Sequence, residues 1–203
     1  MPSIDLAMEP EKALEILKKK EVENDLRAEF EVTVKDRVNR FLQIGHQNIV
    51  AASHFAQAST ECLLLYRDGH FIATVMMSHA INEGIIKFVA DRNALKLTMP
   101  NGDFKSLDLL IEELKQAGKF SDACAEASQG IYRSFRNDVH HMNPKIAQID
   151  FPSLAFKNIQ RLALIEQEIF AFEMEKGALN PKNPAYWDAG PDGYASAFLR
   201  IRF

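Results

Sequence analysis

Apolar residues recur at spacings of three and four along most of this chain, and that period restricts much of it to helices. The segment from Phe71 to about Ala94 carries Val75 and Ile86 on one helical face. Similar stripes run through residues 107–114 and 156–172. The 203 residues include nine glycines and eight prolines, which favours long regular elements over a turn-rich sheet. The expected fold class is all-α, an antiparallel four- to five-helix bundle.

Caps and breakers mark the ends of several expected helices. Ser106 and Ser121 each precede an apolar-periodic segment, where a hydroxyl can accept a hydrogen bond from a free backbone N–H. The first of these helices should end at Gly118, and the second should continue to about Met142. There Asn143-Pro144 stops it, because the residue before a proline avoids the helical region.

The other helices are predicted from composition and period. Glu11–Arg40 is expected to form a charged helix with scattered apolar positions. Phe41–Leu65 is expected to form a long apolar-rich helix, bent near Gly45. A last helix should start near Phe156 and end at Gly177.

Three regions follow from these segments. Residues 1–39 would form an N-terminal helical extension, of which residues 1–8 are a loose tail. Residues 40–178 would form the helical bundle. Residues 179–203 are rich in proline and glycine and are expected to be an irregular C-terminal tail.

Several residues outside the apolar stripes are assigned structural roles. Tyr186-Trp187 is expected to anchor the tail on the bundle, with a partner-binding role for Trp187 as the alternative. Residues 199–203 alternate apolar and basic like one short strand, which is marginal unless something pairs with it. His46 and His54 lie in a largely uncharged segment and are expected to pack or hydrogen-bond in the core.

Composition limits the classes of function. The apolar content of 47% is enough for a sizeable core. Cys62 and Cys124 lack pairing or metal-ligand spacing, so we expect reduced core thiols and a cytoplasmic location. No apolar leader or membrane span is visible, and we expect no membrane partner. The net charge of −4 argues against a broad basic face that coats nucleic acid, but it permits a small local anion site.

The densest group of reactive side chains lies near residue 140. Arg133, Arg136, Asn137 and His140 are at offsets of zero, three, four and seven, so one unbroken helix would place them on one face. Arginine offers a planar fork that matches phosphate oxygens. Histidine is the side chain best suited to give and take protons near neutral pH.

This segment resembles the motif of the HEPN family. The motif residues are Arg136-Asn137-Asp138-Val139-His140-His141. HEPN domains are small helical bundles that carry an arginine and a histidine separated by four to six intervening residues, and the residue after the arginine is commonly polar, often Asn or His. The chain matches with four intervening residues if His141 is the family histidine, and the resemblance extends over roughly residues 40–178.

The resemblance implies metal-independent cleavage of RNA by a homodimer. A histidine would act as general acid or base, Arg136 would stabilise charge on the phosphate, and Asn137 would position it. The implied setting is a toxin or defence protein, with an antitoxin or regulatory protein as a further partner. No cofactor is implied.

The spacing leaves two histidines as candidates. On an unbroken helix Arg136 and His140 lie about 40° apart, whereas His141 lies about 140° from Arg136. The family pattern selects His141, while helix geometry favours His140. We expect His141 to carry the chemistry and His140 to support it.

A second group is expected to support the motif from another helix. His79 and Glu83 are one turn apart on an otherwise apolar stripe. A buried carboxylate needs a partner, which Arg136 or Arg133 would supply. A structural ion pair and a group that fixes Arg136 are compatible interpretations.

Other interpretations remain open from the sequence. The domain could be a non-catalytic HEPN-like module that binds RNA, a nucleotide or a protein, or a helical adaptor in which the motif is incidental. A metal site built from His79, Glu83, Asp138 and His141 is disfavoured, because no known metal-binding spacing is present.

Overall fold

A computed structural model describes residues 10–191 and 193–200. The chain divides into two compact units, Met1–Asn39 and Arg40–Phe203. Helix α1 (Pro10–Leu42) supplies the described part of the first unit and continues into the second. The expected loose tail at residues 1–8 lies outside the described residues, as do residues 201–203 of the expected C-terminal strand.

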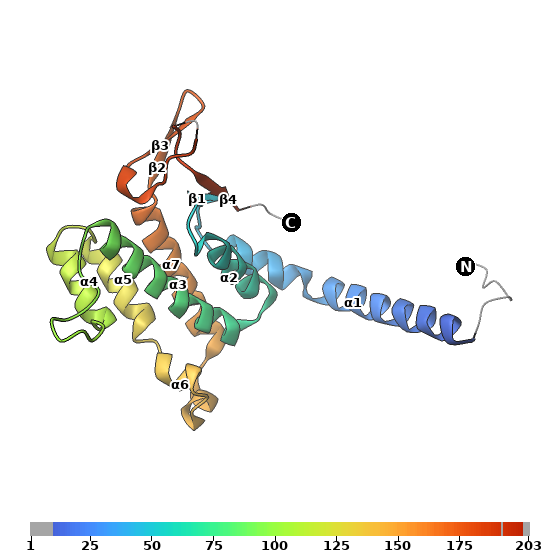
Figure 1. The fold of residues 1–203 in the computed structure, drawn as a ribbon. Helices are drawn as coiled ribbons and strands as arrows, with labels where there is room; N and C mark the ends of the chain where they lie inside the picture. Colours follow the sequence, from blue (N-terminus) through green and yellow to red (C-terminus); the bar gives the residue numbers. More distant parts are fainter. Residues whose placement is uncertain (1–9, 192, 201–203) are drawn as a thin grey trace. The chain divides into compact units, whose positions relative to one another are not determined.

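The second unit is mainly helical with two small antiparallel sheets (Figure 1). Its helices are α2 (Ala56–Asp68), α3 (Phe71–Arg92), α4 (Leu107–Gln116), α5 (Asp122–Tyr132), α6 (Arg136–His140) and α7 (Phe151–Ile169). Its strands are β1 (Ile49–Ala51), β2 (Phe172–Glu175), β3 (Ala178–Pro181) and β4 (Ala197–Leu199). Two short 3-10 helices, η1 (Pro144–Gln148) and η2 (Pro184–Tyr186), complete it. The helical character expected from the sequence is therefore confirmed, and the two small sheets depart from the all-α expectation.

Helix α3 is the central element of this unit, since α2, α4, α5, α6 and α7 all contact it. Its inner face buries Val75, Ile85, Ile86 and Val89 completely. The side chains around them come mainly from α7 and α5, including Ile159, Ile165 and Ile131, in a single hydrophobic core. The side chains that α3 does not bury in this core are therefore the ones available to a site.

Local signals predict α4 and the start of α5 correctly. Ser106 and Ser121 cap the two helices by accepting hydrogen bonds from the backbone N–H groups of Leu109 and Cys124. The apolar positions of α4 are all buried, namely Leu107, Leu110, Ile111 and Leu114. Capping and period agree here, so local signals are enough to predict the helix, and its buried stripe packs against α3 and α5.

The predicted helix over Phe41–Leu65 is wrong. Helix α1 ends at Leu42, strand β1 occupies residues 49–51, and α2 begins at Ala56. The short strand forms because β4 pairs with it in antiparallel register, with Val50 opposite Phe198. Because β4 is so distant in sequence, no local pattern of apolar residues indicates that β1 is a strand. His46 is half-buried, but His54 is exposed, so the expectation of a core position fails for His54.

The predicted end of the last helix is also wrong. Helix α7 starts at Phe151, where the Asp150 side chain caps it, and it ends at Ile169 rather than at Gly177. Lys176 and Gly177 instead form the turn of the β2–β3 hairpin, both with positive φ (52° and 83°). Two consecutive left-handed residues match the twist of a two-residue hairpin turn, and glycine adopts this conformation without strain.

The C-terminal segment is more ordered than an irregular tail. Trp187 is buried and its ring contacts those of Phe170 and Phe172, so the expected anchoring role is confirmed. Further along the chain, β4 pairs with β1 in a two-stranded antiparallel sheet. It shares only Leu199 with the expected strand over residues 199–203.

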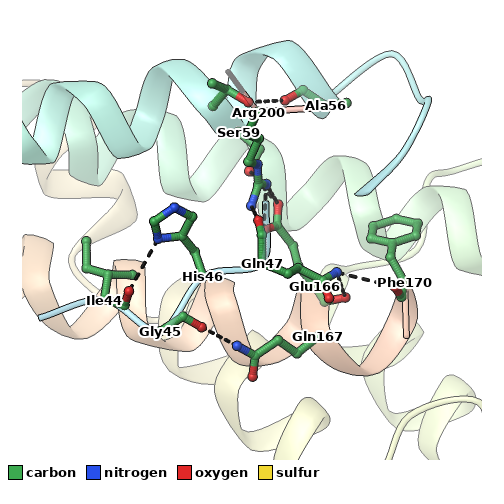
Figure 2. A network of polar contacts seen from close by, with 11 residues as sticks. Ile44, Gly45, His46, Gln47, Ala56, Ser59, Glu166, Gln167, Phe170 and Arg200 are labelled. Atoms are coloured by element: carbon green, nitrogen blue, oxygen red, sulfur yellow. Dashed lines mark hydrogen bonds and ion pairs between the residues drawn. The ribbon is translucent and has the colours of Figure 1, made fainter. Parts of the chain in front are cut away.

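Arg200, immediately after β4, enters the protein interior (Figure 2). Its guanidinium donates to both carboxylate oxygens of Glu166 at 2.7 Å and to the hydroxyl of Ser59 at 2.6 Å. It also donates to the backbone carbonyl of Gln47 at 3.0 Å. The side chains of Arg200 and Glu166 are 3% and 4% exposed. This buried ion pair joins the C-terminal segment to α2 and α7, and the sequence pattern did not reveal it.

Candidate functional site

The motif residues lie on a short separate helix, not on an extension of α5. Helix α5 ends at Tyr132, and Phe135 adopts a left-handed conformation with φ of 57° before α6 begins. That conformation costs a non-glycine residue on the order of 1 kcal/mol, so tertiary contacts must hold it. The predicted continuous helix to Met142 is therefore wrong. Among the large apolar residues of this stretch, Ile131 and Val139 are buried, whereas Phe135 and Met142 are exposed.

Arg136 begins α6 and reaches across to α3. Its guanidinium donates to one carboxylate oxygen of Glu83 at 3.1 Å, and Lys87 donates to the other at 2.6 Å. The Arg136 guanidinium also lies 5.9 Å from the ring centre of Tyr132. The expected pairing of Glu83 with Arg136 is confirmed. With 38% of the Arg136 side chain and 27% of the Glu83 side chain exposed, the pair is open to solvent.

The carboxylate of Glu83 is ionised in this arrangement. Burial alone would raise its pKa, but the hydrogen bonds and charges of Lys87 and Arg136 outweigh burial and hold the pKa below its ordinary value. A charged Glu83 orients the Arg136 guanidinium through one charge-assisted hydrogen bond from a terminal nitrogen. The remainder of the guanidinium is partly exposed to solvent.

Beneath this pair, His79 lies in a buried polar network. Its Nε2 is 2.9 Å from the hydroxyl of Ser134, which donates its hydrogen to the backbone carbonyl of Ile131 at 2.6 Å. Asn158 of α7 donates to the same hydroxyl at 3.0 Å. Since a hydroxyl has one hydrogen, Ser134 must accept from His79, and the proton of neutral His79 lies on Nε2. Its Nδ1 is then a buried acceptor, and it has no partner among the described residues.

His79 stays neutral at physiological pH. Burial is the largest cause that lowers its pKa to about 4, and the charges of His140 and Arg136 act in the same direction. The rings of His79 and His140 are 5.5 Å apart, centre to centre. His79 is 2% exposed. His79 is therefore too buried to contact a ligand directly, and it acts as a supporting residue behind the exposed side chains of the site.

The remaining motif residues point in different directions. Asn137 is exposed on α6. Asp138 accepts a hydrogen bond from the side chain of Asn143 at 3.0 Å, which ties α6 to the following turn. His140 is exposed beside His79. His141 caps α6 at its C-terminal end and is exposed, with no side-chain hydrogen bond to any residue the structure describes.

Arg133 does not belong to this cluster. The break after α5 turns it toward α4, where its guanidinium donates to Asp108 at 2.9 Å and 3.2 Å. The expectation that Arg133 shares a face with Arg136 is wrong, because the chain is not helical between Tyr132 and Arg136. Arg133 is also not the partner of Glu83.

Sequence reasoning missed three residues that hold the site together. Lys87 shares the Glu83 carboxylate with Arg136, while Ser134 and Asn158 orient His79. Two signals were available. Lys87 lies four residues after Glu83, a favourable helical ion-pair spacing. Asn158 lies on the apolar face of α7, next to Ile159 and Leu162, where a polar residue needs partners.

Large apolar side chains flank the motif in sequence. Phe135 before α6 and Met142 after it remain exposed, as does Ile72 at the start of α3. A shallow apolar hollow at the start of α3 is lined by Phe71, Ile72, Met76 and Phe151. Exposed apolar surface of this kind is typical of a contact with another protein molecule.

The described part of the chain holds neither a metal-ligand cluster nor a helix suited to span a membrane. No three His, Cys, Asp or Glu side chains there converge in a way that would hold a metal ion. Between residues 10 and 200, Asp192 excepted, no helix is long and apolar enough to cross a membrane.

Comparisons with protein-family models, with curated proteins and with solved structures found no match for this chain. The resemblance to the HEPN family therefore rests on residues 136–141 and on the helical context alone.

Proposed function

We propose that this protein is a metal-independent endoribonuclease of HEPN type that acts as a homodimer. The observation that carries the proposal is the arrangement on α6, where a solvent-accessible arginine is fixed by Glu83 beside two exposed histidines. This supplies a charge stabiliser and proton-transfer groups within six residues of the chain.

The reaction would proceed by attack of a ribose 2′-oxygen on the adjacent phosphorus. One histidine would take the 2′-hydroxyl proton, and another would give a proton to the 5′-oxygen as its bond to phosphorus breaks. The products would be a 2′,3′-cyclic phosphate and a free 5′-hydroxyl. Arg136 would stabilise charge on the non-bridging oxygens, and Asn137 would hold the phosphate.

A second copy of the chain would complete the site. His141 is exposed at the end of α6, and the neighbouring Phe135 and Met142 are exposed as well. A dimer that covered these apolar side chains would bring two α6 helices together and place two Arg136 guanidiniums near one phosphate. That local charge would offset the net charge of −4. A toxin or defence role in the cytoplasm, with an antitoxin partner, is part of the same proposal.

RNA cleavage in EDTA tests this proposal directly. Purified full-length protein would be incubated with mixed tRNA and mRNA beside Arg136→Ala, His140→Ala and His141→Ala. We expect 2′,3′-cyclic ends from the wild type and a loss of rate of about 100-fold or more in Arg136→Ala and His141→Ala. His140→Ala should lose less, because it is the supporting histidine.

Arg133→Ala is the matched control, since it removes an exposed arginine three residues away that faces α4. Circular dichroism and sedimentation would check folding and dimerisation of every variant. If a folded dimeric wild type leaves all RNA intact, the proposal fails, and a non-catalytic module that binds RNA, a nucleotide or a protein replaces it. Equal cleavage by wild type and Arg136→Ala would point to a contaminating nuclease.

A further inference from the structure

A second candidate site lies on the same helix, further along α3. An open cleft of about 690 Å³ is formed by α3, the loop before α2 and the C-terminal segment. Its α3 side is built from Gly84, Lys87, Phe88 and Asp91. Phe198 of β4 contributes a second aromatic side chain. This volume falls within the range of small-molecule sites. The ring of Phe88 packs against those of Phe55 and Phe170 and lies under the Arg92 guanidinium, so Phe198 offers the surface on which a planar ring can stack.

Some of the charged side chains in the cleft have ion-pair partners and one does not. Lys87 is paired with Glu83, and Arg92 is paired with Asp188 while its guanidinium lies 5.0 Å from the ring centre of Phe88. Asp91 is exposed and has no ion pair or side-chain hydrogen bond within residues 10–191 and 193–200. The charge that lacks a partner is therefore negative, so the cleft favours a ligand that presents N–H donors over a bare phosphate.

Among planar rings, guanine matches this arrangement best. Its N1–H and N2 amino group are adjacent donors, which the two oxygens of one carboxylate can accept together. Its O6 and N7 are acceptors for a cation such as Lys87. Adenine and cytosine present one amino group beside an unprotonated ring nitrogen, whose lone pair would face the second carboxylate oxygen of Asp91.

The cleft is also physically linked to the α6 site. Lys87 and Arg136 hold opposite oxygens of the same Glu83 carboxylate. Glu83, Lys87 and Asp91 follow one another at intervals of four residues, so each step rises about 6 Å along α3. A base in the cleft would thus lie next to a phosphate held by Arg136.

We propose that the cleft lined by Lys87, Phe88 and Asp91 binds a guanine base. If the base belongs to an RNA bound at Arg136, the inference rests on the proposed function. In that case the cleft would select guanine next to the cleaved phosphate. The same chemistry would accept a free guanine nucleotide.

Binding measurements on the full chain separate these cases without requiring cleavage. Isothermal titration would compare GMP, IMP, which lacks the 2-amino group, and AMP. It would also compare short 2′-O-methyl RNAs with one G or with A in its place, because these cannot react. We expect GMP to bind about tenfold or more tightly than AMP, with IMP between them. Asp91→Asn should remove most of this preference, whereas Asp25→Asn, an exposed aspartate of α1, should leave it unchanged.

Each outcome has a defined meaning. A guanine preference in the 2′-O-methyl RNAs that Asp91→Asn abolishes supports the RNA subsite, and the same result with GMP alone supports a free nucleotide. Equal binding of all probes, no binding of any probe, or a preference that survives in Asp91→Asn overturns the inference. Guanine binding by a protein that cleaves no RNA would reject the proposed function while leaving this inference in place.

Discussion

Two arginine–glutamate pairs in this protein differ in almost every physical respect. The Arg200–Glu166 pair is nearly excluded from solvent, at 3% and 4% exposed, and Ser59 and Gln47 supply further hydrogen bonds. The side chains of the Arg136–Glu83 pair are 38% and 27% exposed. Lys87 forms a second ion pair with the same Glu83 carboxylate. The Arg200–Glu166 pair is part of the protein interior, whereas the Arg136–Glu83 pair leaves its arginine accessible to solvent.

The contrast shows that residue type alone does not assign a role. A buried pair is costly to break, because removal of one partner leaves the other charge without solvent or counterion. An exposed pair contributes little to folding, since water and salt screen it. Under the proposed function, the role of the exposed pair is to orient a guanidinium for binding and not to stabilise the fold.

The largest expected effect concerns the buried pair. Arg200→Ala should lower the free energy of unfolding by about 3–5 kcal/mol, because Glu166 would remain buried and unpaired. Urea denaturation followed by circular dichroism would measure this. The double variant Arg200→Met/Glu166→Gln, which removes both charges, should recover part of the loss. If Arg200→Ala is as stable as the wild type, the buried pair contributes no more to the free energy of unfolding than the exposed pair.

The next effect depends on pH and concerns His79. The unfolded chain binds a proton at His79 near pH 6.5, whereas the folded chain resists protonation until pH falls to about 4. Unfolding therefore takes up a proton between these values, and stability should fall as pH falls, by up to about 1.4 kcal/mol per pH unit. Glu83, with its lowered pKa, adds to this at the acidic end. His79→Gln, which cannot titrate, should flatten the dependence; an unchanged slope would exclude His79 as its source.

A smaller change in stability is expected from the exposed pair. Glu83→Gln should alter the free energy of unfolding by less than about 1 kcal/mol. RNA cleavage should nevertheless decline, because Arg136 would lose the charge that orients it. Denaturation and initial cleavage rates on the same preparation would separate the two effects. A stability loss as large as that of Arg200→Ala would remove the distinction between the pairs.

The smallest effect is expected from Arg133. Its pair with Asp108 is exposed, so Arg133→Ala should change stability by no more than about 0.5 kcal/mol. Cleavage should be unchanged, because the side chain faces α4 and not Glu83. A loss of cleavage in a stable Arg133→Ala variant would place Arg133 in the RNA-binding surface after all.

The parts of the fold that were predictable have their causes close together in sequence. Helix α4 has a capping serine, a regular apolar stripe and a terminating glycine within thirteen residues, Ser106–Gly118. The Glu83–Arg136 pairing was predictable because a carboxylate on an apolar stripe needs a cation, and few were available nearby.

The unpredicted parts depend on distant contacts. Phe135 takes a left-handed conformation without any glycine or proline to signal it, and that break alone separates Arg133 from the motif. Likewise, nothing near Glu166 indicates that its partner is Arg200, 34 residues later. The identity of the acting histidine stays a prediction, since His140 and His141 are both exposed.

The placement of Arg200 also affects how the chain folds during synthesis. Glu166 is synthesised 34 residues before its counterion Arg200. At 5–20 residues per second, that gap lasts about 2–7 seconds. Strand β1 is likewise translated about 150 residues before β4, so it cannot form its backbone hydrogen bonds until β4 is made. A nascent chain therefore cannot complete its native core step by step, and chaperones have their best opportunity to bind it during this interval.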